Sequence, residues 1–251
     1  MVPKIFLALL ALLLASCVTS SPQSDYGVRK GFEAYIPARI SVLSCIPLPL
    51  SARYAGLKPI NISEEDQKKL CGEFDKKVIE GFTGQPFMKG YTPALVAQLL
   101  KKNSATGILK DVPLLWSFDQ SSCPGCNSGP RAYENQTEKS AKWLNWLNQF
   151  SKATRYSDAI LIPFLVDAWE AHNDDRGVLL SERYVKADLF LIDTNHGKLL
   201  WSGTRSATVN NQSLRESPAS EYPPYPHWDR LTDRLFTEAL WLSFPGRQMN
   251  D

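Results

Sequence analysis

One stretch of sequence decides the fold: Ala159-Ile160-Leu161-Ile162-Pro163-Phe164-Leu165-Val166. Its residues are apolar throughout, which is typical of a strand that is covered on both faces. Because Pro163 has no backbone N–H to donate, we expect a bulge or a locally unpaired position there. The stretch therefore predicts a central strand of a sheet.

Two further strands are predicted downstream, and they form the clearest hairpin in the chain. Residues 184–192 and 198–209 read as strands, and the segment between them, Asp193-Thr194-Asn195-His196-Gly197, has the composition of a short turn. Residues 170–181 are polar and are predicted to form a loop before this hairpin. After the hairpin, prolines at positions 218 to 226 predict irregular chain.

Helices and shorter strands are predicted on either side of these strands. Ser63 is a good helix N-cap with Asp66 three residues later, and Pro93 suits the first turn of another helix. Aromatic residues at helical spacing around Trp143 and Trp146 indicate a helix that packs on the core. The predicted strands are residues 38–43 and 86–91, and the predicted helices begin after residue 63, at 92, at 138 and at 228, the last three ending near 102, 154 and 244.

This order of elements predicts an α/β fold in which helices pack on a mixed or antiparallel sheet. The sequence contains 7 Trp, 9 Tyr and 11 Phe, which indicates a folded core rather than a disordered stalk. We expect residues 37–251 to form a single domain, interrupted by irregular chain over residues 103–138.

The N-terminus predicts export and lipidation. A single charge at Lys4 precedes an apolar run, which ends in Leu14-Ala15-Ser16-Cys17. The run is too short for a spanning helix, which needs roughly 20 apolar residues, and small residues before a cysteine are typical of a bacterial lipoprotein signal peptide. The alternative is an ordinary secretory signal in which Cys17 has no role.

We expect residues 1–16 to be removed, Cys17 to carry diacylglycerol, and residues 17–36 to form a periplasmic tether. Val18 follows the lipidated residue where an Asp often retains such proteins at the inner membrane. The sequence thus predicts an outer-membrane lipoprotein facing the periplasm of a Gram-negative bacterium. Its formal net charge of +2 provides no basic field for nucleic acid, so the acyl chains would supply the membrane affinity.

Four cysteines remain after lipidation: Cys45, Cys71, Cys123 and Cys126. An even number in an oxidising compartment favours disulfides, and four cysteines allow three pairings. Proximity favours Cys123–Cys126, which leaves Cys45–Cys71, but the sequence alone does not choose.

The Cys123-Pro124-Gly125-Cys126 motif also carries the alternative function, a periplasmic thiol-disulfide redox protein. Thioredoxin-like sites place such a pair in a βαβ context, and the surrounding serine- and glycine-rich sequence lacks it. A structural disulfide that closes a long loop is the preferred interpretation. The same pair could supply half of a zinc site.

No other catalytic or cofactor site is predicted. His172, His196 and His227 are isolated in the sequence, so no metal is expected. Phosphate-loop, nucleophile-elbow and zinc-protease motifs are absent from the sequence. We therefore expect neither catalysis nor a cofactor. A pocket for a small apolar ligand beside Trp143 or Trp146 is a third possibility.

One surface segment is a candidate for binding another protein: Tyr222-Pro223-Pro224-Tyr225-Pro226-His227-Trp228. Proline fixes an extended backbone, and the aromatic side chains, Tyr222, Tyr225 and Trp228, offer contact area to a partner. The alternative is that these rings pack the loop onto the body of the protein.

The hairpin phrase Asp193-Thr-Asn-His-Gly-Lys-Leu-Leu-Trp201, with residues 187–192 before it, resembles the periplasmic α/β group that includes the N-terminal domain of TolB and the lipoprotein CsgG. The resemblance implies the same kind of α/β fold. It also implies an envelope assembly or accessory factor that binds another envelope component without catalysis. Neither the cysteine-rich segment nor residues 103–138 belong to this pattern.

Overall fold

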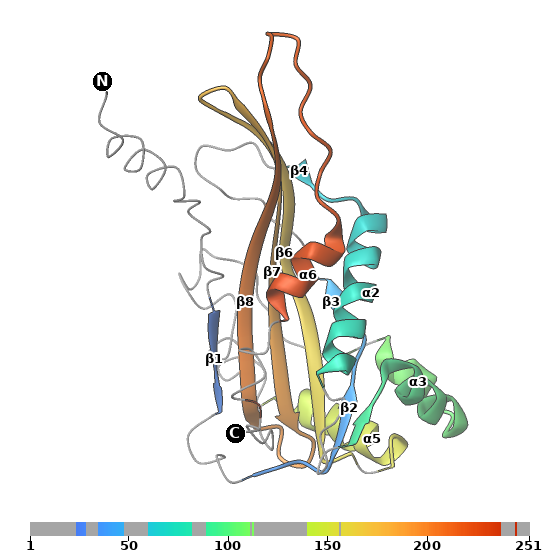
Figure 1. The fold of residues 1–251 in the computed structure, drawn as a ribbon. Coiled ribbons are helices and arrows are strands. Elements are labelled where there is room, and N and C mark those ends of the chain that lie inside the picture. The colour runs from blue at the N-terminus through green and yellow to red at the C-terminus, as the bar shows by residue number, and fades with distance from the viewer. Residues whose placement is uncertain are drawn as a thin grey trace.

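Helices pack on one mixed sheet in the computed structural model of the chain, so the predicted α/β class is confirmed (Figure 1). The main path of the sheet runs β1-β8-β7-β6-β2-β5, and β3 and β4 also pair with β6. The structure describes residues 24–28, 35–47, 60–81, 89–110, 112, 140–155, 157–236 and 244. The strands are β1 (Ser24–Val28), β2 (Arg39–Val42), β3 (Ile46–Pro47), β4 (Ile60–Asn61), β5 (Lys89–Tyr91), β6 (Ala159–Asp175), β7 (Val178–Asp193) and β8 (Leu199–Leu214).

The helices begin close to where their capping residues predict. Ser63 accepts a hydrogen bond from the Asp66 N–H at 3.1 Å, and Thr92 accepts one from the Leu95 N–H at 3.2 Å. The helix predicted from residue 138 begins later, at Ala141, because Ser140 is its cap. The helices are α2 (Glu64–Glu80), α3 (Pro93–Lys102), the 3₁₀ helix η1 (Thr106–Leu109), α5 (Ala141–Ala153) and α6 (Trp228–Leu235).

Helix α6 is shorter than its apolar spacing predicts. It ends at Leu235, and Phe236 leaves the helical conformation and packs edge-on against Phe74 of α2, with ring centroids 5.1 Å apart. Of the positions predicted to extend it, 237–243 lie outside the described residues. No helix in the described ranges is long and apolar enough to cross a membrane.

The predicted loop over residues 170–181 is wrong, because these residues belong to a long hairpin. β6 continues to Asp175 and pairs antiparallel with β7, which begins at Val178. The two-residue turn between them places Arg176 at φ 52° and Gly177 at φ 86°. Positive φ at both central positions is the hairpin turn that matches strand twist. The polar side chains of residues 170–181 therefore belong to strands and the turn that joins them. Strands β6, β7 and β8 form a long antiparallel meander.

The irregularity expected at Pro163 divides into two features. Pro163 pairs with Leu189 of β7, while on its other side β6 has pairing partners only up to Leu161 and again from Phe164. This is the locally unpaired position that its missing N–H requires. The bulge itself lies further on, where the register shifts around Val166.

The bulge changes which side chains of β6 share a face. Alternation alone would place Leu165 and Ala168 on opposite faces of the sheet, yet both belong to one buried cluster. The extra residue, Val166, restores them to the same face. On β6, the even-numbered side chains after Val166 consequently lie on the same face of the sheet as the odd-numbered side chains before it.

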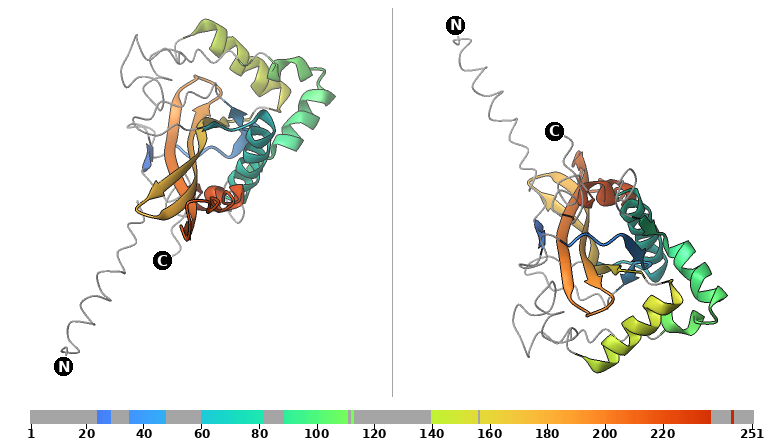
Figure 2. Two further views of the ribbon diagram at one scale, coloured as in Figure 1. Left: turned by 90° about the horizontal axis from the view of Figure 1, so that it is seen from above. Right: turned by 90° about the horizontal axis from the view of Figure 1, so that it is seen from below.

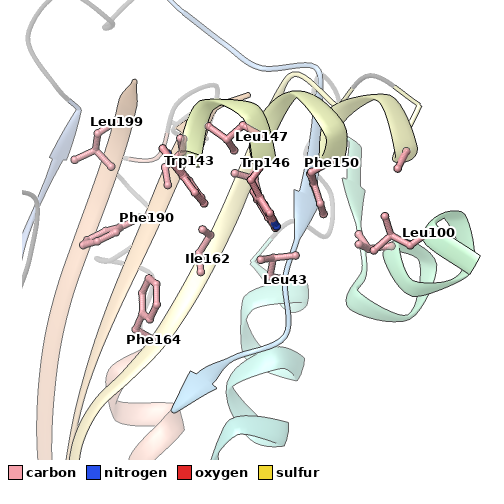
Figure 3. Packing of buried hydrophobic residues seen from close by; sticks show 14 residues of the cluster. Leu43, Leu100, Trp143, Trp146, Leu147, Phe150, Ile162, Phe164, Phe190 and Leu199 are labelled. Carbon is pink, nitrogen blue, oxygen red and sulfur yellow. The ribbon is translucent and has the colours of Figure 1, made fainter. Parts of the chain in front are cut away.

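Helices α3 and α5 cover one face of the sheet (Figures 2 and 3). The predicted aromatic stripe of α5 is buried there, with Trp143 stacked on Trp146 and Trp146 on Phe150, each pair of ring centroids 5.1 Å apart. The indole N–H of Trp146 donates to the Ile108 carbonyl of η1 at 2.9 Å. The stripe is therefore part of the core, packed against residues that include Leu43, Leu100, Ile162, Phe164, Phe190 and Leu199.

Helices α2 and α6 cover the opposite face, which we call the α2 face. Leu70 and Phe74 of α2 and Leu231 and Leu235 of α6 pack there on β6, β7 and β8. A disulfide joins Cys45, just before β3, to Cys71 of α2, with Cα atoms 5.1 Å apart. The disulfide bond ties α2 to the segment of chain that leads directly into β3.

Candidate functional site

Residues 221–227, which we call the Tyr-Pro loop, lie on the α2 face beside the far end of the meander. The loop has few N–H groups to offer because three of its residues are proline, so the sheet binds it through its carbonyl groups. The carbonyl of each of the three prolines accepts a hydrogen bond from a sheet side chain. Ser181 donates to Pro223, Asn211 to Pro224 at 2.7 Å, and Arg183 to Pro226 at 2.6 Å.

Aromatic rings and the Arg183 guanidinium form one continuous stack between the loop and the sheet. His172 of β6 lies between the rings of Tyr222 and Tyr225, at centroid distances of 4.4 and 4.6 Å. The Arg183 guanidinium then lies 5.5 Å from the Tyr225 ring centroid and 4.0 Å from that of Trp228. Such stacking stabilises both the rings and the cation, and it fixes the shape of the loop.

An ion pair beneath the stack orients Arg183. Glu170 of β6 and Arg183 of β7 are direct cross-strand partners, and the Glu170 carboxylate lies 2.8 Å from Nε and 2.6 Å from Nη2 of Arg183. Their side chains are only 16% and 15% exposed, so solvent screens the pair weakly. With one nitrogen also bound to the Pro226 carbonyl, the guanidinium has little freedom to move.

The three predicted partner-binding residues differ in exposure. Tyr222 is 39% exposed and forms the outer end of the stack. Tyr225 is half-buried, and burial raises the pKa of its phenol. Trp228 is 8% exposed and packs in the α2-face cluster. Contact with a partner stays a prediction for this segment, and Tyr222 offers the ring surface for it.

His172 and Ser181 lie within hydrogen-bond distance of each other, as a serine nucleophile and its general base do in some enzymes. Ser181 is fully buried, its hydroxyl donates to the Pro223 carbonyl, and its oxygen lies 3.0 Å from His172 Nδ1. Since that hydroxyl has no second proton, Nδ1 must carry the hydrogen and donate it. A protonated Nδ1 cannot accept the serine proton, so the pair serves to hold the loop.

A pocket of about 370 Å³ lies between α6 and β8. It is lined by Val209 and Asn210 of β8 and by Arg230, Asp233 and Arg234 of α6. Arg234 donates to the Thr208 carbonyl, and Arg230 donates to the Asn211 side chain at 3.0 Å. Asp233 is paired with Lys77 of α2 at 2.8 Å, and this hydrogen bond raises the pKa of Lys77. No sequence motif pointed to this pocket.

The remaining predicted sites fall into two groups. Cys17, Cys123 and Cys126 lie outside the described residues, so lipidation and the second disulfide stay predictions. His196 lies in the turn between β7 and β8, where its Nδ1 is 2.6 Å from Asp193. Within the described ranges no group of three or more His, Cys, Asp or Glu side chains is placed to hold a metal ion.

Sequence reasoning missed His172, Glu170 and Arg183 as parts of this surface. Their partners lie up to about fifty residues away in the chain, and the strands that carry them were predicted as loop or left unassigned. The local signal that could have found them is Arg176-Gly177, a turn flanked by residues able to pair.

No protein-family model matches the sequence, and no curated protein matches it. Among solved structures, the chain is similar to the PelC dodecamer from Paraburkholderia phytofirmans, with 11% identity over 90% of this chain and 99% of that one and a TM-score of 0.38. It is also similar to lipoprotein GNA1162 from Neisseria meningitidis, with 15% identity over 73% and 88% of the two chains and a TM-score of 0.35. At these scores neither similarity supports a conclusion about function, and the grouping with TolB and CsgG stays a prediction.

Proposed function

We propose that this protein is a non-enzymatic envelope lipoprotein that binds, or helps to assemble, another envelope component. Lipidation at Cys17 would anchor it to the outer membrane, and the domain beyond the tether would face the periplasm. The N-terminal sequence supports the location, and the Tyr-Pro loop supports the binding role.

The observation that carries the proposal is the fixed shape of the Tyr-Pro loop. Its carbonyl groups are bound by three side chains of the sheet, and its rings are stacked on His172 and Arg183. A surface that is ordered before binding loses little conformational entropy when a partner docks. Tyr222, at the outer end, offers an aromatic ring of the type enriched in protein interfaces.

Site-specific photo-crosslinking in the living bacterium tests this role. A benzophenone amino acid is placed at position 222 of the full lipidated chain, and the matched control carries it at exposed position 142 on α5. We expect position 222 to form a discrete adduct with one envelope protein, and position 142 to form none. Absence of an adduct from position 222, or the same adducts from both positions, would contradict the proposed use of this surface.

The anchor is tested separately by intact mass spectrometry of the protein purified from membranes. We expect the N-terminal residue to be Cys17 with its acyl groups, and Cys17→Ala to release the protein from the membrane fraction. Retention of residues 1–16, or an unmodified Cys17 in membrane-bound protein, would contradict the lipoprotein assignment.

A further inference from the structure

The outer edge of β8 is only partly paired. β1 pairs with β8 from Trp201 to Arg205, and no strand in the described part of the chain pairs with the same edge from Ser206 to Leu214. An uncovered edge is a row of backbone donors and acceptors that can pair with another chain. This edge runs directly beside the pocket between α6 and β8, because Asn210 lines that pocket.

Two hydrogen bonds establish which backbone groups of β8 face outward. The N–H of Arg215 donates to the Gly177 carbonyl at 2.8 Å, so position 215 faces β7. The N–H and C=O of a residue in an antiparallel strand point the same way, and the direction alternates along the strand. Even-numbered residues therefore face outward, in agreement with the bond from Arg234 to the Thr208 carbonyl.

Beyond Thr208, the outward groups are those of Asn210, Gln212 and Leu214. None of them has a backbone partner on this side among the described residues. Leu214 is 74% exposed. The edge thus offers alternating N–H and C=O groups over five residues, enough for a short added strand.

The adjoining pocket presents positive charge. Asp233 is the acidic residue in its lining, and Lys77 neutralises it at 2.8 Å. Arg230 and Arg234 have no carboxylate within 4 Å of their guanidinium nitrogens in the described part of the chain. Each binds a neutral oxygen through one nitrogen, which leaves N–H donors suited to an incoming carboxylate.

We propose that the outer edge of β8, from Asn210 to Leu214, accepts an extended acidic segment of a partner polypeptide as an added strand. A carboxylate of that segment binds between Arg230 and Arg234, and the backbone of the segment pairs with the outer edge of β8. This inference rests on the proposed binding role and adds the chemistry of a partner, at a surface separate from Tyr222.

Charge and geometry favour this occupant over two others. A second copy of the chain, paired edge to edge across a two-fold axis, would bring two sets of arginines toward each other. A small anion would use the guanidinium groups but leave the backbone edge of Asn210 and Gln212 unpaired. An acidic extended peptide satisfies both features at once.

Fluorescence anisotropy with a labelled peptide of alternating Glu and Val tests the proposal on the full chain. One control peptide replaces Glu with Gln, and another keeps Glu but is N-methylated at alternate residues, so that it cannot pair along one edge. The protein variants are Arg230→Gln and, as a matched loss of charge, Arg176→Gln, whose side chain is 96% exposed at the hairpin tip. Asn210→Pro removes an outward N–H that β7 does not use.

We expect the Glu-Val peptide to bind, and Arg230→Gln to weaken binding about tenfold or more, since a charged hydrogen bond is lost. Asn210→Pro and N-methylation should weaken it similarly, and Arg176→Gln should not. Peptide binding and the crosslinking test at position 222 are separate measurements, so failure of one is distinct from failure of the other.

Three results would overturn the inference. Equal binding of the N-methylated and unmodified peptides would show an anion site without strand addition. Equal binding of the Gln-Val peptide would remove the role of the arginines. Concentration-dependent dimers in sedimentation, abolished by Asn210→Pro, would show that the edge pairs with a second copy.

Discussion

The meander of β6, β7 and β8 has two halves that are stabilised in different ways. In the proximal half, residues 159–165, 187–193 and 199–205, apolar side chains are buried on both faces beneath helices. In the distal half, residues 167–175, 178–186 and 206–214, the α2 face carries an ion pair, stacked rings and bound carbonyl groups. The same three strands therefore pass from a core that is apolar on both faces to a region in which polar contacts adjoin buried apolar residues such as Val185 and Val209.

This difference separates stability from recognition. Burial of apolar area is strong but non-directional, so we expect the proximal half, with its two apolar faces, to contribute more to the free energy of folding than the distal half. Hydrogen bonds and stacking are directional and individually weaker, so they fix the positions of Tyr222 and Arg183. We expect substitutions in the proximal half to affect the whole fold and those in the distal half to affect mainly the Tyr-Pro loop.

The largest expected effect is the loss of a proximal aromatic ring. Phe164 is 1% exposed and lies 5.7 Å from Phe190, measured between ring centroids. Phe164→Ala should lower the free energy of unfolding by about 3–5 kcal/mol, because it leaves a cavity. Urea unfolding measures it, and Leu214→Ala at an exposed distal site is the control, with almost no change. Equal losses from the two variants would remove the distinction between the halves.

The second largest expected effect is the loss of the disulfide bond. Cys45 and Cys71 are 26 residues apart in the chain, and their bond constrains the unfolded state. Replacing both by Ala should cost about 3 kcal/mol in unfolding free energy. Cys45 also donates its N–H to Asp75 at 2.7 Å, and burial raises the pKa of that carboxyl. Unchanged stability of the double variant would mean that the helix is held to the sheet by packing alone.

The Glu170–Arg183 pair is the sharpest test of the distal half. Arg183→Met should destabilise by about 2 kcal/mol, because it leaves the Glu170 carboxylate without its partner in a poorly solvated place. Adding Glu170→Gln should recover much of that loss. Hydrogen exchange should show faster opening of residues 221–227 in the single variant and little change in the proximal strands. Uniform acceleration across the meander would contradict independent halves.

The smallest expected effect depends on pH at the N-terminus of α2. A hydrogen bond from the Ser63 hydroxyl, at 2.8 Å, is the main cause that holds the pKa of Asp66 below its usual value. The ionised carboxylate therefore stabilises the fold above the ordinary pKa of 3.8, and that contribution is lost as the pH falls through the lowered pKa.

Asp66→Asn should accordingly cost less than about 1 kcal/mol near neutral pH. The difference in unfolding free energy between the two proteins should shrink in acid, as the pH falls through the lowered pKa of Asp66. Urea titrations at neutral and at acid pH measure it. A difference in unfolding free energy that persists in acid would mean that the substitution acts through the shape of the side chain and not through its charge.

Sequence patterns predicted the proximal half well and the distal half poorly. The apolar run from Ala159 and the turn at Asp193 are local signals, and the structure confirms the strands that they predict. Capping by Ser63 and Thr92 is also local. Polar residues such as His172 carry no local sign of a strand, because the rings that stack on them, Tyr222 and Tyr225, arrive from about fifty residues later.

The candidate site was predicted only in part for the same reason. The aromatic and proline composition of residues 222–228 indicated a surface segment, but its burial at Trp228 depends on α2 and the sheet. Arg230 and Arg234 occupy the polar side of a short amphipathic helix, a position that usually means contact with water. Their juxtaposition with the outer edge of β8 exists only in three dimensions.

The bulge at Val166 makes chain length, as well as residue type, a determinant of the protein's surface. Because Leu165 pairs with Ala187 and Asp167 with Lys186, deleting Val166 would remove the bulge and leave the later pairs in register, whereas deleting a residue beyond it would shift that register by one. Such a shift would turn His172 away from the Tyr-Pro loop, while the apolar residues before the bulge would keep their places. A single insertion or deletion in β6 beyond the bulge is thus a route by which related chains could acquire a different recognition surface on an unaltered core.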